Sequence, residues 1–377
     1  MGCNHSAEKR ITPQPDPDPV HKEEEVQQEK PIHNDQTDNE PKSNSAGSAE
    51  DTYEIVEPPP NFAQQPKGIS ETKSFFSSKE KPTIFEYKFK EHIGHGAQSD
   101  VFLTVNIETG QYYAAKVYDQ NYLCRNSIGD AERPIEKFAQ EVQIMSTVSQ
   151  RNCLNLIELL QDEFTNTIIL ILPYADDGAL SSYSYKADPC PEDKAKKYFF
   201  QIGLGLQHIH SMNIIHRDIK PDNVLKFKDG HVVIADFSVS KILEAPEGDE
   251  LLDDTDGTPA FYSPEECRGD PYYGKPADVW AYGMTLYVMI YGKLPFFDPD
   301  DGGVFFSQFF SISQKIIEDD FPYSESIPIS NDLRDLFSHL LDKNAKTRYT
   351  IEEALNHRWF AECLDEYMKE QEQQGQG

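Results

Sequence analysis

The chain has 377 residues, 38% of them hydrophobic, which is enough for two or three packing units with a sizeable buried core. Its formal net charge is -30, and this argues against a nucleic-acid-binding protein because such proteins bring basic residues to the phosphates. The six cysteines are scattered without a Cys-x-x-Cys pair, which favours a reducing compartment.

The first residues of the chain match the Met-Gly-x-x-x-Ser pattern of N-myristoylation. Gly2 is the candidate myristoylation site, and Cys3 is placed for palmitoylation. One myristoyl chain binds a membrane only marginally, with a binding constant of about 10⁴ M⁻¹, so stable attachment requires the second chain. A chance match is the alternative, but residues 1–10 are predicted to be a lipidation signal that attaches a cytoplasmic protein to the cytoplasmic face of a membrane.

From about residue 7 to residue 80 the chain is rich in Pro, Glu, Asp, Gln, Asn and Ser. Such a segment cannot bury enough apolar surface to offset the conformational entropy that is lost on ordering. We therefore predict that residues 11–80 are a disordered, acidic, Pro-rich linker. A short apolar patch at residues 53–56 could dock on a folded part, but a solvated linker is favoured.

A small antiparallel β-sheet is predicted after about residue 85. Strand-like runs of apolar residues occur, in chain order, at residues 87–90, 101–105, 112–117 and 167–172. Between the third and fourth runs, apolar residues at helical spacing predict a helix over residues 135–149.

After residue 178 the pattern becomes mainly helical. Helices are predicted over residues 192–211, 277–292, 330–342 and 350–359. The longest uncharged apolar run, 279–292, is shorter than the roughly 20 residues that cross a bilayer, so it should be a buried helix. The pattern predicts an α+β fold of two lobes with a cleft between them: an N-lobe over 85–173, a C-lobe over 176–360, and an acidic, Gln-rich tail over 361–377.

Residues 216–223, His-Arg-Asp-Ile-Lys-Pro-Asp-Asn, are typical of a phosphoryl-transfer loop. Asp218 would accept a hydroxyl proton, Lys220 would neutralise the transferred phosphoryl group, and Asn223 would bind a metal. Asp236 follows across a predicted hairpin and would share a Mg²⁺ site with Asn223, because both offer hard oxygen ligands. The Asp-Phe-Ser sequence at 236–238 has Ser238 where a glycine is usual, but this loses no metal ligand.

A glycine-rich loop is predicted between the first two strands, where Gly94 and Gly96 would let backbone N–H groups approach phosphate oxygens. A plain turn is the alternative, and Ser99 stands where a third glycine is usual. Lys116 lies inside an apolar strand, so its ammonium needs anionic partners. ATP phosphates and Glu141 would supply them, whereas an edge-strand lysine that reaches solvent is the less favoured interpretation.

The segment after Asp236 contains the candidate phosphorylation site Thr255 and also Thr258. Thr255 lies among aspartates, and Arg217 beside the catalytic aspartate needs an anion from this segment. Either these carboxylates partly replace a phosphate, or they form a solvated acidic loop.

Two further contacts of buried polar residues are predicted. Glu265 should be buried and should pair with Arg348, since a lone buried carboxylate is costly. Asp278 should hold the backbone of the catalytic loop, and capping a helix is an alternative role that does not exclude the first.

In this order the motifs resemble those of the eukaryotic protein kinases, over about residues 87–360, and residues 220–223 resemble the Ser/Thr-specific form. The closest likeness is to the calcium/calmodulin-dependent protein kinase kinases and related kinases that activate AMP-activated-type kinases. The residues that carry it are 133–136, 229–237, 239–240, 257–261, 277–281 and 341–344.

The resemblance implies a Ser/Thr protein kinase that uses ATP and Mg²⁺ on protein substrates, with activation-loop threonines of AMP-activated or calmodulin-kinase-type kinases as one candidate class. The resemblance places the nucleotide-binding hinge at Pro173 and Ala175. A kinase hinge uses the carbonyl of the first of these residues and the N–H and carbonyl of the second, so the N–H that Pro173 lacks is not needed. The ATP-binding residues that it implies are Ile93, Gly94, Gly96, Val101, Ala114, Lys116, Glu141, Pro173, Ala175 and Leu225.

Two departures from that subfamily affect the functional prediction. Only 24 residues separate Lys116 from Glu141, where the subfamily has a long Arg/Pro-rich insert. The C-terminal tail is acidic rather than basic, which argues against direct calmodulin binding. Ser99 and Ser238 motivate an alternative, a catalytically weak, membrane-tethered kinase-like scaffold, but the intact chemical positions favour an active enzyme.

Overall fold

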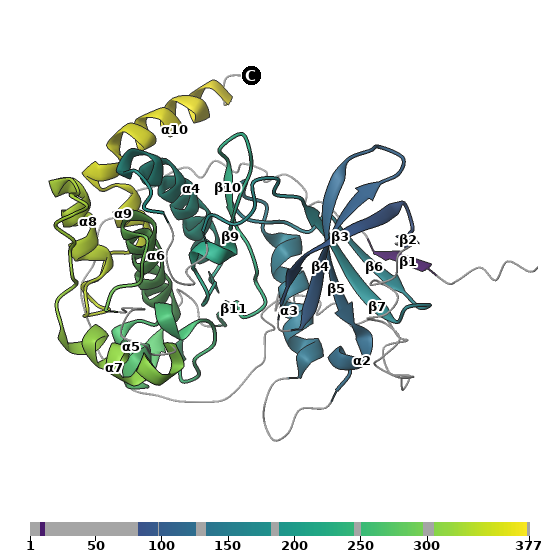
Figure 1. Cartoon of the computed structure of the whole chain (residues 1–377), viewed down its shortest axis with the longest axis horizontal. Helices are drawn as coiled ribbons and strands as arrows, with labels where there is room; N and C mark the ends of the chain where they lie inside the picture. The colour runs from purple at the N-terminus through teal and green to yellow at the C-terminus, as the bar shows by residue number, and fades with distance from the viewer. Residues whose placement is uncertain are drawn as a thin grey trace, which may run out of the picture. The chain divides into compact units, whose positions relative to one another are not determined.

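A computed structural model describes residues 8–11, 82–96, 98–125, 133–181, 188–244, 250–296 and 305–374. The described part has a β-rich lobe, coloured from purple through blue to teal in Figure 1, and a mainly helical lobe, coloured from teal to yellow. The predicted α+β, two-lobe fold is therefore confirmed. Gly2, Cys3 and residues 12–81, with the predicted linker's apolar patch, lie outside the described residues.

The N-lobe is built on an antiparallel sheet with the strand order β1-β6-β7-β5-β4-β3-β2. Its strands are β1 (Glu8–Ile11), β2 (Thr83–Ile84), β3 (Tyr87–His95), β4 (Ser99–Asn106), β5 (Tyr112–Asp119), β6 (Glu158–Asp162) and β7 (Thr167–Pro173). Side chains alternate between the two faces of each strand. Ala115, opposite Phe102, is buried in a hydrophobic cluster on one face, so its neighbour Lys116, opposite Val101, points to the other face.

Strand β1 lies in the segment that was predicted to be the lipidation signal, and it ends at Ile11, where the predicted linker begins. Residues 8–11 pair antiparallel with β6, from Glu8 opposite Asp162 to Ile11 opposite Leu159. Backbone hydrogen bonds to a sheet edge do not need an apolar run, so composition gave no sign of this strand. The N-terminal segment therefore includes a strand of the N-lobe sheet, at the start of the predicted linker.

Two helices of the N-lobe follow β5, namely α2 (Gln120–Leu123) and α3 (Pro134–Thr147). Pro134 occupies the first turn of α3, where its missing N–H costs nothing. The buried face of α3 carries Phe138, Glu141, Ile144 and Met145, which are spaced three or four residues apart. Glu141 is the acidic residue on this otherwise apolar face, so it must find a partner within the lobe.

The C-lobe packs its helices around α6, whose residues from Ala277 to Tyr291 are all buried. The helices are α4 (Glu192–Ser211), α5 (Pro264–Arg268), α6 (Gly274–Tyr291), α7 (Phe305–Glu318), α8 (Asn331–Leu340), α9 (Ile351–Leu355) and α10 (Ala361–Gln374). The 3-10 helices are η1 (Pro221–Asn223), η3 (Pro259–Phe261) and η5 (Arg358–Phe360). Helix α10 forms most of the predicted tail, for which the sequence analysis predicted no element.

Short strands of the C-lobe flank residues 216–223 and the segment that follows Asp236. They are β8 (Ile214–Ile215), β9 (Val224–Lys226), β10 (Val232–Ile234), β11 (Lys241–Ile242), β12 (Leu251–Leu252) and β13 (Tyr272–Tyr273). Strand β9 pairs with β10, β8 with β11, and β12 with β13.

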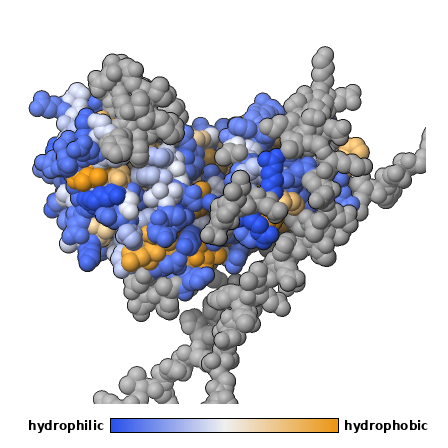
Figure 2. Space-filling view, turned by 90° about the horizontal axis from the view of Figure 1, so that it is seen from below, coloured by the Kyte–Doolittle hydropathy of each residue, from blue (hydrophilic) through white to orange (hydrophobic). Residues whose placement is uncertain are grey.

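None of the helices in the described ranges is long and apolar enough to span a bilayer. On the face drawn in Figure 2, hydrophobic residues form small separate patches among hydrophilic ones. The apolar run of α6 is buried in the core of the C-lobe, as the sequence predicted.

Candidate active site

The hairpin β9–β10 brings the phosphoryl-transfer loop and Asp236 together. Val224 lies opposite Ile234, so Asn223, just before β9, and Asp236, just after β10, lie at the same end of the hairpin. The N–H of Ala235 donates to the carbonyl of Asn223 at 2.8 Å. Two oxygen-bearing side chains that are 13 positions apart in the chain thereby become neighbours.

The Asp218 carboxylate is held by one oxygen and has the other available. Oδ2 accepts from Lys220 Nζ at 2.7 Å and from Asn223 Nδ2 at 2.8 Å. Oδ1 is buried and has no hydrogen-bond partner among the described residues. Lys220 Nζ also donates to Thr258 Oγ1 at 2.6 Å, which brings the activation segment to this loop. An oriented carboxylate with one unpaired oxygen is suited to accept a proton from a bound hydroxyl group.

Lys116 joins the two lobes through two carboxylates. Its Nζ lies 2.7 Å from Glu141 Oε1 and 2.9 Å from Asp236 Oδ1. Burial alone would lower the pKa of Lys116, but the two carboxylates outweigh it and raise this pKa well above its usual value. Burial would raise the pKa of Asp236, but Lys116 lowers it to about 2. Lys116 and Asp236 are therefore both charged at neutral pH.

Tyr118 completes the environment of Glu141, and the sequence analysis did not identify it. Its hydroxyl donates to Glu141 Oε2 at 2.7 Å, so both carboxylate oxygens of Glu141 have a partner. The available signal was strand alternation, because residues 116 and 118 of β5 lie on the same face.

The donor set at the end of the hairpin fits Mg²⁺. Asn223 uses its amide nitrogen to donate to Asp218, which leaves the amide oxygen for a metal. Asp236 is ionised and its side chain is 41% exposed, so its carboxylate can be reached. Hard oxygen ligands of this kind suit Mg²⁺ that is bound largely through nucleotide phosphates.

Asp278 holds the catalytic-loop backbone from the start of α6. Its Oδ2 accepts from the N–H of His216 at 2.7 Å, and its Oδ1 accepts from the N–H of Arg217 at 2.8 Å. The first of the two predicted roles is confirmed. The helix-cap interpretation is wrong, because α6 begins at Gly274, one turn earlier.

The buried His216 links the loop to the residue before Asp236. Its Nδ1 accepts from the N–H of Asp218 at 3.3 Å, so the other ring nitrogen, Nε2, donates to the carbonyl of Ala235 at 3.1 Å. This pattern requires the neutral ring, and burial lowers the pKa of His216 accordingly. The ring of Phe237 packs against it at 5.2 Å.

The activation segment contacts Arg217 through the aspartates on either side of Thr255. Arg217 Nη2 lies 2.8 Å from Asp254 Oδ2, and Nη1 lies 3.4 Å from Asp256 Oδ2. Lys137 on α3 lies 3.1 Å from the same oxygen of Asp256. Thr255 itself is exposed. The carboxylates are therefore bound to cations rather than merely solvated.

Gly257 is a second residue that the sequence analysis did not single out. It has a φ of +97°, and a Cβ atom there would lie 2.3 Å from the carbonyl oxygen of Arg217. Only glycine allows this approach without a backbone shift.

The apolar positions of the expected nucleotide site come from both lobes. Gly94 lies opposite Val101, Tyr113 opposite Pro173, and Ala114 opposite Leu172. In the glycine-rich loop, the N–H of Gly96 donates to the carbonyl of Ser99 at 2.8 Å, and Ile93 is 41% exposed. Ala175 is buried shortly after β7, and Leu225 forms an isolated β-bridge with Ala179.

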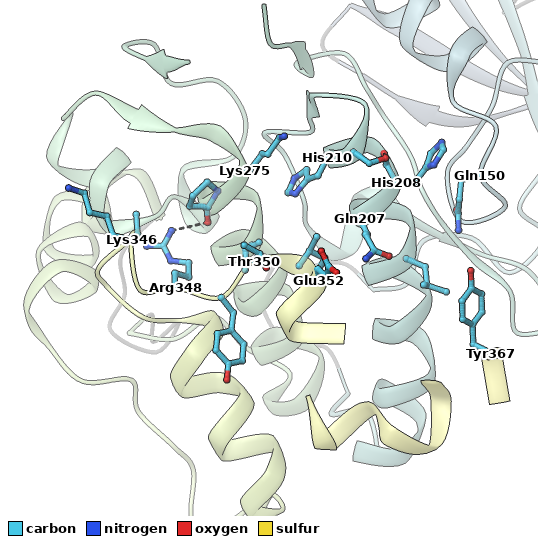
Figure 3. Close-up of a pocket in the computed structure, with 17 residues that line it drawn as sticks. Gln150, Gln207, His208, His210, Lys275, Lys346, Arg348, Thr350, Glu352 and Tyr367 are labelled. Atoms are coloured by element: carbon cyan, nitrogen blue, oxygen red, sulfur yellow. Dashed lines mark hydrogen bonds between the residues drawn. The ribbon is translucent and has the colours of Figure 1, made fainter. Parts of the chain in front are cut away.

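The predicted pair of Glu265 and Arg348 is present and buried. Arg348 Nη1 and Nη2 donate to the two oxygens of Glu265 at 2.7 and 3.0 Å. Arg348 also donates to the carbonyl of Pro276 at 2.8 Å, shown by the dashed line in Figure 3, and lies over the Trp280 ring at 5.0 Å.

Arg348 borders a pocket of about 630 Å³ on the C-lobe, between α4 and residues 345–352 (Figure 3). His210 also lines it and shares the carboxylate of Asp278 with the catalytic loop. The lining contains none of the predicted catalytic, nucleotide or metal residues, so this hollow is separate from the Asp218 centre.

Comparison with known proteins agrees with this geometry. Residues 87–360 match the family model described as protein kinase domain. The chain is 34% identical over 277 residues to serine/threonine-protein kinase GRIK1 of Arabidopsis thaliana, covering 74% of this chain and 67% of that protein. It is 32% identical over 293 residues to a calcium/calmodulin-dependent protein kinase kinase of Caenorhabditis elegans, covering 73% of this chain and 52% of that protein. A 34% match to a probable serine/threonine-protein kinase of Dictyostelium discoideum covers 73% of this chain but only 38% of that protein.

Proposed function

The chain belongs to the protein kinase family and is a protein serine/threonine kinase, and on this premise we propose that Asp218 is its catalytic base. The observation that carries the proposal is the unpaired Oδ1 of Asp218 beside an Oδ2 that Lys220 and Asn223 hold in place. The family implies ATP and a divalent metal such as Mg²⁺.

The proposed reaction transfers the γ-phosphoryl group of ATP to a Ser or Thr hydroxyl. The hydroxyl oxygen forms the new bond to the γ-phosphorus, the bond to the bridging oxygen of ADP breaks, and the hydroxyl proton passes to Asp218. Lys220 lies 2.7 Å from Asp218 and would neutralise charge on the moving group, while Lys116 would bind the α- and β-phosphates. Asp236 and Asn223 would hold Mg²⁺, which supplies further neutralisation of the phosphates when it is bound.

The first test replaces Asp218 with Asn, which keeps the shape of the side chain but removes the base. Transfer of labelled phosphate from Mg-ATP to a generic basic protein should fall by about 10²-fold or more, with nucleotide binding retained. Asp229→Asn, in an exposed turn, is the matched control and should remain active. Full activity of the Asp218 variant would refute the assignment. A wild-type protein that neither binds Mg-ATP nor transfers phosphate would instead favour the scaffold alternative.

As to substrate, we infer that activation-loop threonines of other kinases, of the AMP-activated or calmodulin-kinase type, are the target. Support comes from the motif resemblance and from the similarity to the worm protein, whose name describes a kinase of kinases. The experiment offers inactive candidate kinases as substrates, each paired with a version whose activation-loop Thr is changed to Ala. Phosphorylation of the Thr version alone supports the proposal, and equal labelling of both refutes it. Repeating the assay with calcium/calmodulin tests the expectation that calmodulin has no direct effect.

We further propose membrane attachment through acyl groups on Gly2 and Cys3, on the strength of the sequence pattern. Gly2→Ala and Cys3→Ser should each move the protein from the membrane fraction to the soluble fraction, because two chains are needed. Unchanged partitioning of the Gly2→Ala protein would remove the proposal.

A further inference from the structure

The two strands of the glycine-rich hairpin, β3 and β4, carry two histidines and an aspartate whose candidate metal-ligand atoms lie close together. His92 Nε2 lies 3.0 Å from Asp100 Oδ1, and His95 Nδ1 lies 2.6 Å from the same oxygen. All three candidate ligand atoms lie within 4.8 Å of one another. Phosphate transfer as derived above uses none of these residues, and none belongs to the predicted nucleotide site.

Two irregularities of β3 produce this convergence. In a regular strand, residues three apart such as His92 and His95 point to opposite faces of the sheet. Here the pairing of β3 with β4 shifts by one residue before His92 and by another between His92 and Gly94. The shifts place His92 opposite Phe102 and His95 opposite Asp100, so both imidazoles reach the same carboxylate.

The cluster lies on the face of the sheet away from the nucleotide. Asp100 is opposite Val117 and Phe102 is opposite Ala115, which belong to the hydrophobic cluster of that face. Val101, the neighbour of Asp100, lies opposite Lys116 and therefore points to the face of the sheet that carries Lys116. An ion at the cluster would join β3 to β4 without occupying the ATP site.

We propose that His92, His95 and Asp100 form a binding site for a divalent transition-metal ion of the Zn²⁺ type, which cross-links the two strands of the glycine-rich hairpin. Two imidazole nitrogens and one carboxylate oxygen are ligands that Zn²⁺ accepts, whereas Mg²⁺ prefers oxygen ligands alone. In a tetrahedral zinc site with bonds of about 2.0–2.1 Å, neighbouring ligand atoms lie about 3.3 Å apart. The two distances to Asp100, 3.0 and 2.6 Å, are shorter than this value, so the ligand atoms must separate by less than about 1 Å to admit the ion.

The two histidine side chains are accessible from solvent. His92 and His95 are 45% and 67% exposed, so an ion can reach them from solvent with small side-chain rotations.

A second His–carboxylate cluster in the C-lobe provides the contrast. Asp335 lies 3.2 Å from His357 and 4.0 Å from His339, but the guanidinium of Arg358 lies 2.9 Å from the same carboxylate. A bound cation would be repelled there, so this cluster should not bind zinc.

The test measures Zn²⁺ binding to the full-length, untagged protein in Mg²⁺-containing buffer by calorimetry, and binding of Co²⁺ by its visible absorption. Wild-type protein should bind one ion at this site, and His92→Asn, His95→Asn and Asp100→Asn should each weaken binding by about tenfold or more. His339→Asn serves as the matched control. Cys124→Ser removes an exposed thiol that could bind zinc independently. Both control variants should bind zinc as the wild type does.

A second measurement locates the ion. Amide hydrogen exchange of residues 92–101 should slow when Zn²⁺ is added to wild-type protein and should not change in the His95→Asn variant. Zinc affinity that is unaffected by all three substitutions, or lost in the Cys124→Ser control, would overturn the proposal. The melting temperature of each variant without zinc identifies a loss of binding that comes from misfolding, and the remaining variants then decide.

Discussion

Arg217 Nη2 lies 2.8 Å from Asp254 Oδ2, which ties the residue before the catalytic base to the activation segment. The Arg217 side chain is only 6% exposed, so its charge requires an anionic partner. Burial opposes the charge, but Asp254 raises the pKa of Arg217, and Arg217 in turn lowers the pKa of Asp254. A carboxylate of the activation segment thus supplies the anion that Arg217 was predicted to need.

From this contact we propose that the enzyme has basal activity without phosphorylation of Thr255. Changing Asp254 and Asp256 together to Asn keeps their size but removes both negative charges from Arg217. Kinase activity of phosphatase-treated protein should fall by about tenfold, a modest value because Asp254 is 57% exposed and solvent screens the pair. Asp253→Asn, an exposed neighbour, is the control and should leave the rate unchanged.

The companion variant Thr255→Ala tests whether activity requires a phosphate on Thr255 or whether the aspartates on either side of it are sufficient. It should keep most of the activity, because the carboxylates on either side hold Arg217. If phosphatase-treated wild-type protein and Thr255→Ala are both inactive, a phosphate on Thr255 is required and the carboxylates are insufficient.

Gly257→Ala should inactivate the enzyme while leaving it folded. The added Cβ would lie 2.3 Å from the carbonyl oxygen of Arg217 and 3.3 Å from Asp218 Oδ1, so the segment must shift away from the base. We expect a loss of phosphate transfer of about tenfold or more, since misplacing groups by about 1 Å can cost about 10²-fold. Steady-state rates measured with saturating ATP and peptide would show the loss in kcat.

Gly230→Ala is the matched control for backbone strain. Gly230 also has a positive φ, +86°, but nothing lies within 4 Å of the added Cβ. Both substitutions carry a strain of about 1–2 kcal/mol, and only Gly257→Ala should lose activity. Equal rates in the two variants would show that the close approach at Gly257 does not matter for catalysis.

The contacts of the site that could be predicted from the sequence are those within one short loop or those of a buried charge that demands a partner. The spacing within residues 216–223 places the oxygen and nitrogen atoms of Asp218, Lys220 and Asn223 within one loop. A lysine inside an apolar strand and an acid on an apolar helix face had to find each other, and Lys116 pairs with Glu141.

The parts that it missed depend on backbone geometry between distant segments. Strand β1 joins the sheet through main-chain hydrogen bonds to β6. Such pairing does not require a regular alternation of apolar residues, so the sequence pattern did not predict the strand. Gly257 matters because of its approach to Arg217, 40 residues earlier, and a Gly-Thr-Pro sequence alone also fits an ordinary turn. Helix α10 has few apolar residues, so its polar composition suggested a tail.

Loss of the Arg348 side chain should strongly destabilise the C-lobe. Arg348→Met leaves the Glu265 carboxylate buried without its cation, which costs about 3–5 kcal/mol of unfolding free energy. Arg348→Lys keeps the charge but loses the two-pronged hydrogen bonds and the contact with the Trp280 ring, so it should be intermediate. Urea denaturation followed by tryptophan fluorescence would measure both changes.

The matched control for that series is Arg358→Met. Arg358 is 60% exposed and pairs with Asp332 and Asp335 on α8, so its loss should cost less than about 1 kcal/mol. Similar losses for Arg348→Met and Arg358→Met would contradict the importance assigned to burial.

The buried His216 should make the stability of the protein fall as the pH drops below neutral. Burial lowers the pKa of His216 in the folded protein, whereas in the unfolded chain it should be near 6.5. Between these two values the unfolded chain binds more protons, so its free energy falls relative to the folded state as the pH decreases. The stabilisation is fully present above about pH 6.5 and is lost as the pH falls toward the folded pKa, by at most about 1.4 kcal/mol per pH unit for one proton.

Other histidines contribute in the same direction, because burial also lowers the pKa values of His208 and His231. The comparison is therefore between wild-type protein and His216→Gln, which cannot be protonated but retains a donor toward the Ala235 carbonyl. Unfolding free energies from denaturant titrations at pH 7.5, 6.5 and 5.5 should decline less steeply in the variant, even if it is less stable at pH 7.5. Parallel declines would mean that His216 takes up its proton equally easily in both states, contrary to its enclosure between Asp218 and Ala235.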